Sequence, residues 1–485
     1  MELLVPNDIK GVFQYFAQIA AIPHGSGNTG AISDYLVCFA RTNGLRYIQE
    51  DCGNVIIFKP ATKGYENADT VILQGHMDMV CEKESDSSHD FSKDGLDLDI
   101  DGDFLFAKGT TLGADDGIAL AYALAVLADK EAQHPALECV FTVEEETGMD
   151  GAKALDTSVL SGKYLLNLDS EEEDTVLCGC AGGARVTAVL PVRYTLIPAT
   201  TVKVTVSGLL GGHSGTEIDK NRVNAVKLIA RLLFELAGEN DFYLAFLDGG
   251  NKDNAIPREA TAVLATEGDA ACLVASIQEL AERLKKELAA AEPNLSITAK
   301  VEEGEVKEQP VLQPMSFEML LFFLVQAPNG IQSMSSEVPG LVETSLNLGI
   351  FRLGSGEATV HFSLRSSKKS AIAYLREKLC YLIEFIGGEA ECGGEYPAWE
   401  YRADSLLRDR YVREYEKVFL KKPEVTVIHA GVECGILSEK ITDLDAISIG
   451  PLILDIHTTS ERLSISSTLR IFEVLEKVLA GFLKK

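Results

Sequence analysis

VILQGHMDMVCE, residues 71–82, is the segment from which the architecture of this chain is best inferred. Its first four residues are apolar apart from Gln74, and the run ends at Gly75, which predicts a buried strand followed by a loop. His76 and Asp78 come next, and side chains two residues apart in an extended chain point to the same side. A neighbouring carboxylate can hold a metal-binding imidazole in orientation. An isolated HxD pair is more often a loop histidine beside a solvated aspartate, so its meaning depends on the rest of the chain.

The composition limits the class of protein. The chain has 485 residues, too many for one ordinary hydrophobic core, so we expect two or three domains. Lysine and arginine number 44 against 73 acidic residues, which gives a formal net charge of -29. A chain this acidic is a poor partner for nucleic acid or for an anionic membrane.

The N-terminal segment and the cysteines indicate the compartment. The first 25 residues have no basic start and no uninterrupted apolar core, so we expect neither a secretory signal nor a membrane span. Ten cysteines are scattered without a paired framework, which fits a reducing cytoplasm. We interpret the CxC at Cys178 and Cys180 as buried thiols, because no second pair stands at zinc-finger spacing.

Strands and helices alternate through the first part of the chain. Apolar runs predict strands at 54–59, 70–74, 137–143 and 164–168, and apolar spacing predicts helices at 7–21 and 28–43, the second ending at Gly44, and an Ala/Leu-rich helix up to Asp129. Acidic residues gather where these strands finish. The pattern predicts an open α/β sheet whose site lies at the carboxyl edge.

Three groups of acids stand out in this region. Asp115 and Asp116, in TTLGADDG, precede a helix, where the helix dipole stabilises a carboxylate; this is their simplest structural interpretation. Glu144, Glu145 and Glu146 follow a strand, and adjacent carboxylates repel one another unless a cation or water relieves them. Asp169 ends a further strand.

Residues 97–108 resemble half of a calcium-binding EF-hand loop. Asp97, Asp99, Asp101 and Gly102 match its first half, but the twelfth position, which should be a bidentate glutamate, is Lys108. Alternating LDLDI, a DG turn and DFLFA also fit a β-hairpin. We favour the hairpin.

After about residue 186 the pattern changes from α/β to α+β. Two similar sets of helices and strands follow, at about 201–301 and 317–386, before the first pattern returns near Trp399. We predict one domain built from residues 1–186 and 398–485, interrupted by an inserted domain, residues 187–397, made of two related α+β modules.

Six motifs, taken together, resemble a known family. HMDMV (76–80), GTTLGADDG (109–117), TVEEETG (142–148), LNLD (166–169), GGHSG (211–215) and DIH (455–457) are similar to motifs of the co-catalytic dizinc peptidases that include glutamate carboxypeptidase, aminoacylase and peptidase T. LQGHMDMVCE, GLVETSLNLG and HAGVECGIL are most similar to the aminoacyl-histidine dipeptidase branch, also called cytosol non-specific dipeptidases. The resemblance covers about residues 20–465. It implies a phosphorylase/hydrolase-like mixed-sheet α/β catalytic domain with the inserted domain as a lid.

The resemblance also implies a role for each motif residue. His76 and Asp169 would bind one metal ion, Glu146 and His457 the other, and Asp115 would bridge the two. Asp78 would orient His76, and Glu145 would be the general base. Carboxylates mixed with imidazoles and no thiolate suit two divalent ions, zinc first, with cobalt or manganese as alternatives.

In the inserted domain the resemblance assigns substrate contacts. His213 would stabilise the oxyanion, while Asn254 and Arg365 would contact the substrate carboxylate or oxyanion. Because a fork of donors suits a free C-terminal carboxylate, this implies a preference for small peptides, Xaa-His and other dipeptides. We assign the remaining histidines to loops or packing, with His429 the one that could line a pocket: His24, His89, His134, His361 and His429.

Assembly and substrate class stay open at this point. Relatives with a single lid module pair through it, whereas two modules in one chain could imitate that pair, so we expect a monomer or homodimer in which His213 acts within its own chain. The alternatives for activity are an N-acyl amino acid deacylase, an aminotripeptidase, or a catalytically silent metal-binding relative. The presence of Glu145 and all five proposed ligands argues against the last.

Overall fold

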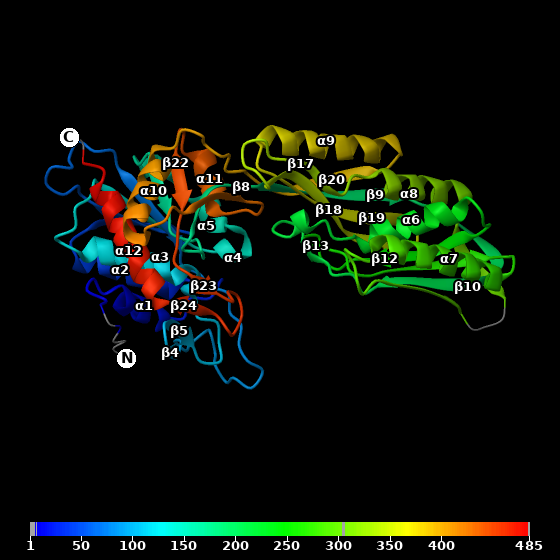
Figure 1. Ribbon diagram of the computed structural model, residues 1–485, viewed down its shortest axis with the longest axis horizontal. Helices are drawn as coiled ribbons and strands as arrows, with labels where there is room; N and C mark the ends of the chain where they lie inside the picture. The colour runs from blue at the N-terminus through cyan, green and yellow to red at the C-terminus, as the bar shows by residue number, and fades with distance from the viewer. Residues whose placement is uncertain (1–4, 6, 303–305, 484–485) are drawn as a thin grey trace. The chain divides into compact units, whose positions relative to one another are not determined.

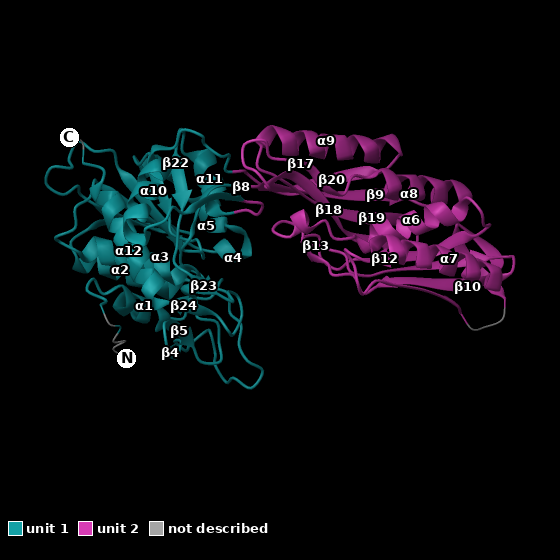
Figure 2. Cartoon of the chain, viewed as in Figure 1, with its two compact units in different colours: residues 1–180, 399–427, 432–485 teal, residues 181–398, 428–431 magenta. Residues whose placement is uncertain are grey.

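The computed structural model describes residues 5, 7–302 and 306–483, and it divides the chain into two compact units. Unit 1 contains residues 1–180, 399–427 and 432–485, and unit 2 contains residues 181–398 and 428–431 (Figures 1 and 2). Unit 2 is thus inserted into unit 1, and each unit has its own hydrophobic core.

Unit 1 is an α/β unit. Its helices are α1 (Val12–Ala20), α2 (Gly30–Thr42), α3 (Ala114–Ala128), α4 (Glu145–Gly148), α5 (Asp150–Ala154), α10 (Leu406–Phe419), α11 (Glu433–Lys440) and α12 (Ile465–Ala480). Its strands are β1 (Arg46–Gln49), β2 (Val55–Lys59), β3 (Val71–His76), β4 (Leu98–Asp101), β5 (Phe104–Ala107), β6 (Leu137–Thr142), β7 (Tyr164–Asn167), β8 (Thr175–Cys180), β21 (Glu424–Ile428), β22 (Asp445–Ser448), β23 (Ile453–Leu454) and β24 (Arg462–Ser464).

Among the described residues, unit 1 is centred on an eight-stranded mixed sheet in the order β1-β2-β6-β3-β7-β22-β8-β21. The four central strands β6, β3, β7 and β22 run parallel, while β1, β2 and β8 pair antiparallel. All six residues of β3 are buried, as expected for a parallel strand covered on both faces. The carboxyl ends of the central strands therefore meet at one edge.

Unit 2 is an antiparallel sheet covered by helices. Its helices are α6 (Ala225–Ala237), α7 (Ala270–Leu288), α8 (Pro314–Gln326) and α9 (Lys369–Phe385). Its strands are β9 (Gly182–Pro191), β10 (Tyr194–Ser207), β11 (Gly212–His213), β12 (Tyr243–Gly249), β13 (Ala255–Ile256), β14 (Ala260–Thr266), β15 (Ser296–Val301), β16 (Lys307–Leu312), β17 (Gly330–Met334), β18 (Val342–Leu353), β19 (Glu357–Ser366) and β20 (Glu389–Tyr396).

Within the described residues, the main sheet of unit 2 has ten strands. Eight follow the order β15-β10-β14-β12-β18-β19-β9-β20, with β16 on β10 and β17 on β18. Apolar side chains of α6, α7, α8 and α9 pack against it in one core. That the insertion consists of two related modules stays a prediction.

Several sequence predictions are confirmed locally. The hairpin is present as β4 and β5, which pair antiparallel around Gly102. Gly44 follows α2 with a positive φ and ends that helix. Cys178 and Cys180 are buried. The helix predicted from residue 7, however, begins only at Val12, because the carboxylate of Asp8 caps the amides of Val12 and Phe13 at 2.8 and 3.0 Å.

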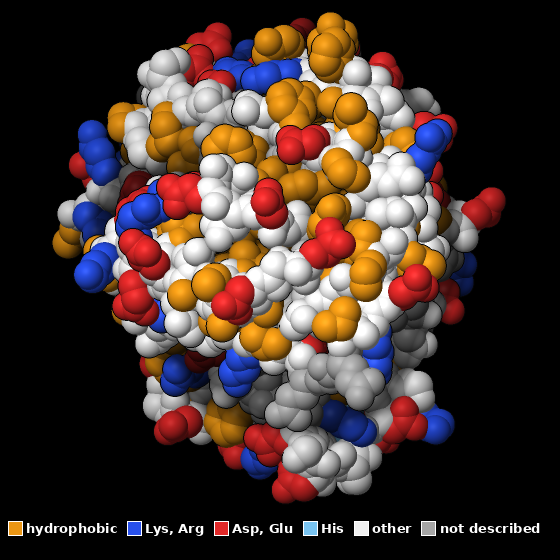
Figure 3. All heavy atoms as spheres, turned by 90° about the vertical axis from the view of Figure 1, so that its right-hand side faces the viewer, with side chains coloured by type: hydrophobic (Ala, Val, Ile, Leu, Met, Phe, Trp, Pro, Cys, Tyr) orange, Lys and Arg blue, Asp and Glu red, His pale blue; other side chains and the backbone are white. Residues whose placement is uncertain are grey.

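Among the described residues, no helix combines the length and apolar character needed to cross a membrane. Figure 3 shows one face of the molecule, on which apolar side chains lie between acidic and basic ones.

Gly450, which follows β22, packs against the backbone next to Asp169. A Cβ atom added there would overlap the carbonyl oxygen of Ser170. We expect Gly450→Ala to lower the free energy of unfolding by about 1–3 kcal/mol, measured by urea denaturation, because the overlap forces the backbone apart. Gly30→Ala is the matched control, since a Cβ there meets nothing within 4 Å. Equal losses in both variants would contradict this steric argument.

Candidate metal centre

The five predicted metal ligands come together in unit 1. His76 ends β3, Glu146 lies in α4 directly after β6, and Asp169 follows β7. Asp115 stands at the start of α3, and His457 lies between β23 and β24. Four of these positions are at the carboxyl edge of the mixed sheet or on the helix beside it, so the fold brings together residues that are hundreds of positions apart.

Asp115 lies between the two imidazoles. Its Oδ1 is 3.1 Å from Nε2 of His76, and its Oδ2 is 3.1 Å from Nε2 of His457. Asp169 Oδ1 approaches the same nitrogen of His76 at 3.5 Å, and Glu146 Oε1 approaches His457 Nε2 at 3.0 Å. The donors therefore form two groups that share one carboxylate.

These groups suit cations. Ligand atoms of Asp115, Glu146 and His457 lie within 4.8 Å of one another, and so do those of His76, Glu145 and Glu146. Imidazole and carboxylate donors without a thiolate match zinc, cobalt or manganese in a hydrolytic site. The residues present thus fit two divalent ions.

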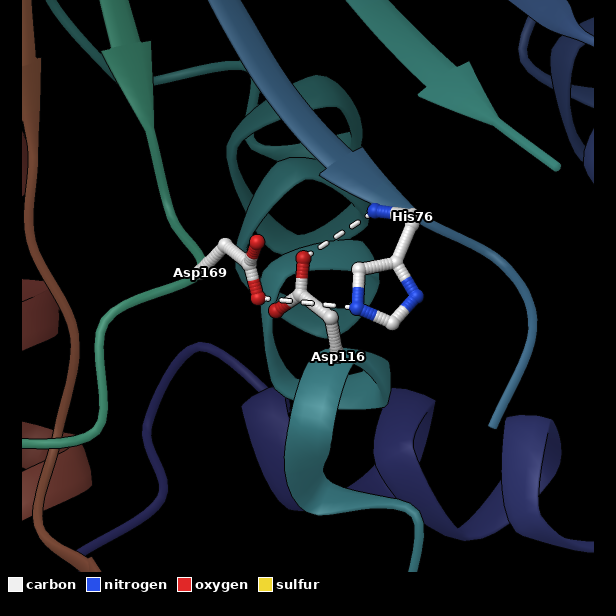
Figure 4. Close-up of side chains that lie close together, drawn as sticks. All are labelled: His76, Asp116 and Asp169. Atoms are coloured by element: carbon white, nitrogen blue, oxygen red, sulfur yellow. Dashed lines mark hydrogen bonds and ion pairs between the residues drawn. The ribbon is translucent and has the colours of Figure 1, made fainter. Parts of the chain in front are cut away.

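Asp116 belongs to the same cluster. The sequence drew attention to this residue but did not indicate that it lies beside His76. Figure 4 shows Asp116 and Asp169 close to His76, and Asp116 Oδ2 accepts a hydrogen bond from the backbone amide of His76 at 3.0 Å. The ligand atoms of His76, Asp116 and Asp169 also lie within 4.8 Å of one another. Burial, with Asp169 nearby, raises the pKa of Asp116 well above its usual value, so this side chain favours the neutral form when no cation is bound.

Asp115 and Asp116 stand in the first turn of α3, as their helix-dipole interpretation requires, but another carboxylate binds the amides at the start of this helix. The amides that lead into α3, those of Leu112, Gly113 and Ala114, donate to the carboxylate of Glu461 at 2.7, 3.1 and 2.9 Å. Glu461 satisfies the orphan donors, which leaves the two aspartates free to face the imidazoles. Nothing local in the sequence identifies a capping residue so far along the chain.

Asp78 contacts both the predicted metal ligand His76 and the segment that carries the predicted general base, Glu145. His76 Nδ1 donates to the backbone carbonyl of Asp78 at 2.9 Å, and its distance to the Asp78 carboxylate is 3.4 Å. That carboxylate accepts from the amides of Glu145 and Glu146 at 3.0 and 3.3 Å and from Ser26 Oγ at 2.8 Å. One buried side chain therefore fixes both His76 and the start of α4.

A buried carboxyl group lies behind the centre. Glu433 is fully buried and accepts from Gln74 Nε2 at 2.5 Å and from Thr142 Oγ1 at 2.7 Å. Asn167 Nδ2 donates in turn to Gln74 Oε1 at 2.7 Å. Burial raises the pKa of Glu433 to about 7. This network joins the ends of β3, β6 and β7, the three strands that precede metal-ligand positions.

The imidazoles carry protons when no cation is bound. Hydrogen bonds to Asp115 and Glu146 raise the pKa of His457 to about 10. Burial opposes the charged form of His76, but Asp169 and Asp115 outweigh it and raise the His76 pKa well above its usual value. Burial also disfavours the Asp115 carboxylate, yet its hydrogen bonds with His457 and His76 hold its pKa low. The two imidazolium ions partly neutralise the acids.

The three predicted substrate residues lie near one another in unit 2. His213, in β11, pairs with Ala255 in β13, and the amide of Ser214 donates to the carbonyl of Asn254 at 2.9 Å. A Cβ atom at Gly215 would lie 3.0 Å from His213 Cε1 and 3.1 Å from Arg365 Nε. A glycine at this position thus permits the close approach of the imidazole and the guanidinium.

His429 joins this second cluster. Its Nε2 lies 2.8 Å from Ser345 Oγ, and its buried Nδ1 has no hydrogen-bond partner among the described residues, like Arg365 Nε. Burial, with Arg365 nearby, lowers the pKa of His429 to about 4. His24 and His134 are also buried, with Nδ1 2.6 and 2.7 Å from the carbonyl oxygens of Ile22 and Pro135, and each likewise has an Nε2 without a partner among the described residues.

A mixed α/β sheet with acids and imidazoles at its carboxyl edge, and one carboxylate between two imidazoles, is typical of metal-dependent hydrolases. The sequence matches the model of Peptidase family M20/M25/M40 over residues 72–481, and the chain belongs to this family. It is therefore a metal-dependent peptidase.

Similar proteins cover nearly the whole chain. The sequence is 39% identical to the cytosol non-specific dipeptidase of Escherichia coli over 471 residues, 96% of each chain. The structure resembles that of an aminoacylhistidine dipeptidase from Vibrio alginolyticus with a TM-score of 0.92 and 37% identity, covering 98% of this chain and 97% of the other. The aminopeptidase PepT of Bacillus cereus, at a TM-score of 0.56, 15% identity and 98% of each chain, shares the fold.

Because the imidazoles must lose their protons to bind a cation, we expect metal affinity to rise with pH between 6 and 9. Zinc added to metal-free protein at pH 7.5 should release at least two protons per chain, one from each imidazole and more from neutral carboxyl groups such as Asp116, measured with a pH indicator in weak buffer. His457→Asn should release about one fewer. Affinity that does not change with pH would show that the histidines are already neutral.

Replacement of Asp78 tests its double role. Asp78→Ala removes the acceptor of the Glu145 and Glu146 amides as well as the carboxylate beside His76. We expect metal affinity to fall about 10- to 100-fold, measured by competition with a chelating dye. Ser26→Ala, which removes only one donor to Asp78, is the control. Unchanged affinity in Asp78→Ala would contradict this role.

Proposed function

We propose that this chain is a dipeptidase that uses two divalent cations, with zinc as the preferred ion. The cations are held by His76, Asp115, Glu146, Asp169 and His457, with Asp115 between them. The observation that carries the proposal is the position of Asp115, with one oxygen toward each imidazole at 3.1 Å. Dipeptides as the substrate class are supported by the similarity over 96% of the chain to a cytosol non-specific dipeptidase. The similarity to an aminoacylhistidine dipeptidase supports Xaa-His among them.

The two cations would supply Lewis acidity, polarising the scissile carbonyl and acidifying the attacking water. Glu145 would take the proton from that water and pass it to the leaving amine. The position of Glu145 fits this role, because its backbone amide donates to Asp78 and its side chain lies in one group of possible ligands with His76 and Glu146. Without a cation, burial raises the pKa of Glu145 well above the usual value, and two bound cations would lower it toward the charged form that accepts a proton.

Residues of unit 2 would bind the rest of the substrate. His213 would donate to the developing oxyanion, and Arg365 and Asn254 would contact the substrate carboxylate or oxyanion. The unpartnered, buried Nε of Arg365 supports this proposal, because a guanidinium N–H that has no protein acceptor is available for a carboxylate. That His213 acts on substrate bound in its own chain stays a prediction, as does the monomeric or homodimeric state.

We also propose that the protein is cytoplasmic. Ten cysteines without a disulfide fit a reducing compartment, and the similar Escherichia coli protein is named for the cytosol.

Replacement of Glu145 tests the mechanism. We expect Glu145→Gln to lose turnover by about 10² or more while retaining both metal ions, because it removes the proton carrier. Hydrolysis of β-Ala-His, Gly-Leu, a tripeptide and an N-acetyl amino acid is measured on metal-stripped protein before and after zinc, cobalt or manganese is added. Glu144→Gln is the matched control, since that carboxylate accepts from the amide of Gly27 instead.

The substrate panel also separates the alternatives. Metal-restored cleavage of dipeptides that is lost in Glu145→Gln supports the proposal. Cleavage of the tripeptide or the N-acetyl amino acid alone, with two metals bound, would show a sister activity of the same family.

A further inference from the structure

Two cysteines of unit 2 lie in contact. The Sγ atoms of Cys380, in α9, and Cys392, in β20, are 3.5 Å apart. A disulfide requires about 2.0 Å between the sulfurs, so the separation that remains is small on the scale of side-chain rotation. The scattered spacing of cysteines along the sequence gave no sign of this pair.

The two thiols lie close together because of the turn that joins α9 to β20. The helix ends in a Schellman turn, in which the amides of Gly387 and Gly388 donate to the carbonyls of Glu384 and Ile383, each at 2.9 Å, with Gly387 at a φ of 82°. A Cβ atom at Gly388 would crowd the side chain of Ile383. The turn thus directs β20 back along the helix.

A second contact fixes the same register. Arg376, one helical turn before Cys380, forms an ion pair with Glu395, three residues beyond Cys392. The turn and the ion pair therefore stand on either side of the thiol pair. Because both hold helix and strand in one antiparallel alignment, the proximity of the sulfurs belongs to the backbone arrangement and not to a single rotamer.

The pair is accessible, and β20 is paired on one side only among the described strands. β20 is at the edge of the described sheet, where it pairs with β9, and most of its residues are exposed. Cys392 is exposed and Cys380 half-buried. An edge strand has a partner on one side only, so a small shift toward α9 breaks few hydrogen bonds.

We propose that Cys380 and Cys392 are a modification site at which a peroxide forms an intramolecular disulfide. The thiolate of Cys392 attacks hydrogen peroxide, giving a sulfenic acid and hydroxide, which takes up the thiol proton to become water. Cys380 then attacks the sulfenic sulfur, the S–O bond breaks, and a second water leaves with the Cys380 proton. Two thiols and one peroxide thus give one disulfide and two waters.

The two thiols differ in exposure, which sets the order of attack. Burial, with Cys392 nearby, raises the pKa of Cys380 to about 11, which makes the exposed Cys392 the first to react.

Peptide mapping of the full chain tests the site. Reduced protein is treated with hydrogen peroxide, alkylated and digested without reductant. Because no lysine or arginine lies between the two cysteines, trypsin leaves both on one peptide, residues 379–402. We expect this peptide to escape alkylation and to be about 2 Da lighter than its dithiol form, a difference that dithiothreitol removes. The oxidised protein should also melt at a higher temperature than the reduced one, because the cross-link restricts the unfolded chain.

Serine variants separate the steps. Cys380→Ser should form no link and should accumulate a sulfenic acid on Cys392, trapped by a dimedone probe; Cys392→Ser should form neither. Cys272→Ser, which removes an exposed thiol of α7, should keep the link and serves as the control. The proposal is overturned if both thiols remain open to alkylation after peroxide, or if Cys392 proceeds to sulfinic acid in the wild type while Cys380 stays free.

Discussion

The constraint on which this structure depends is the gathering of carboxylates at one buried edge of a sheet. Asp115, Asp116 and Asp169 lie around His76, and burial disfavours the negative charge of each of these three aspartates. Nearby positive charge is needed to offset this effect and the repulsion among the acids. His76 and His457 supply it without a cation, and divalent ions supply more. The affinity of the centre for metal and the repulsion among its acids therefore have the same origin.

The surrounding protein resists this repulsion through hydrogen bonds that tie separate elements. Glu433 accepts from β3 and β6, and Asn167 of β7 joins the same network through Gln74. Asp78 joins β3 to α4, and Glu461 holds the start of α3. Each is a buried carboxyl group with several donors. Such residues fix the ligands in position before a cation arrives, which lowers the reorganisation that binding requires.

The sequence was informative where a pattern was local. Strand ends located His76 and Asp169, and alternating residues located the hairpin at 98–107, because these signals depend on neighbours along the chain. The pairing of ligands across two metals came from family resemblance. Asp116, Glu433 and Glu461 were missed, because their partners are distant in sequence and only the fold brings them together. The strands β9 and β20 were missed too; two glycines interrupt β20, whereas residues 184–191 of β9 alternate and carried a signal that was not used.

His457 and Glu461 lie in the same short segment between β23 and β24. His457 Nε2 contacts Asp115, and Glu461 accepts from the amides that lead into the same helix, α3. One segment therefore supplies both a ligand of the centre and the anchor of the helix that carries the shared carboxylate. A change in the conformation of residues 455–461 would act on the ligand and on the position of Asp115 at the same time.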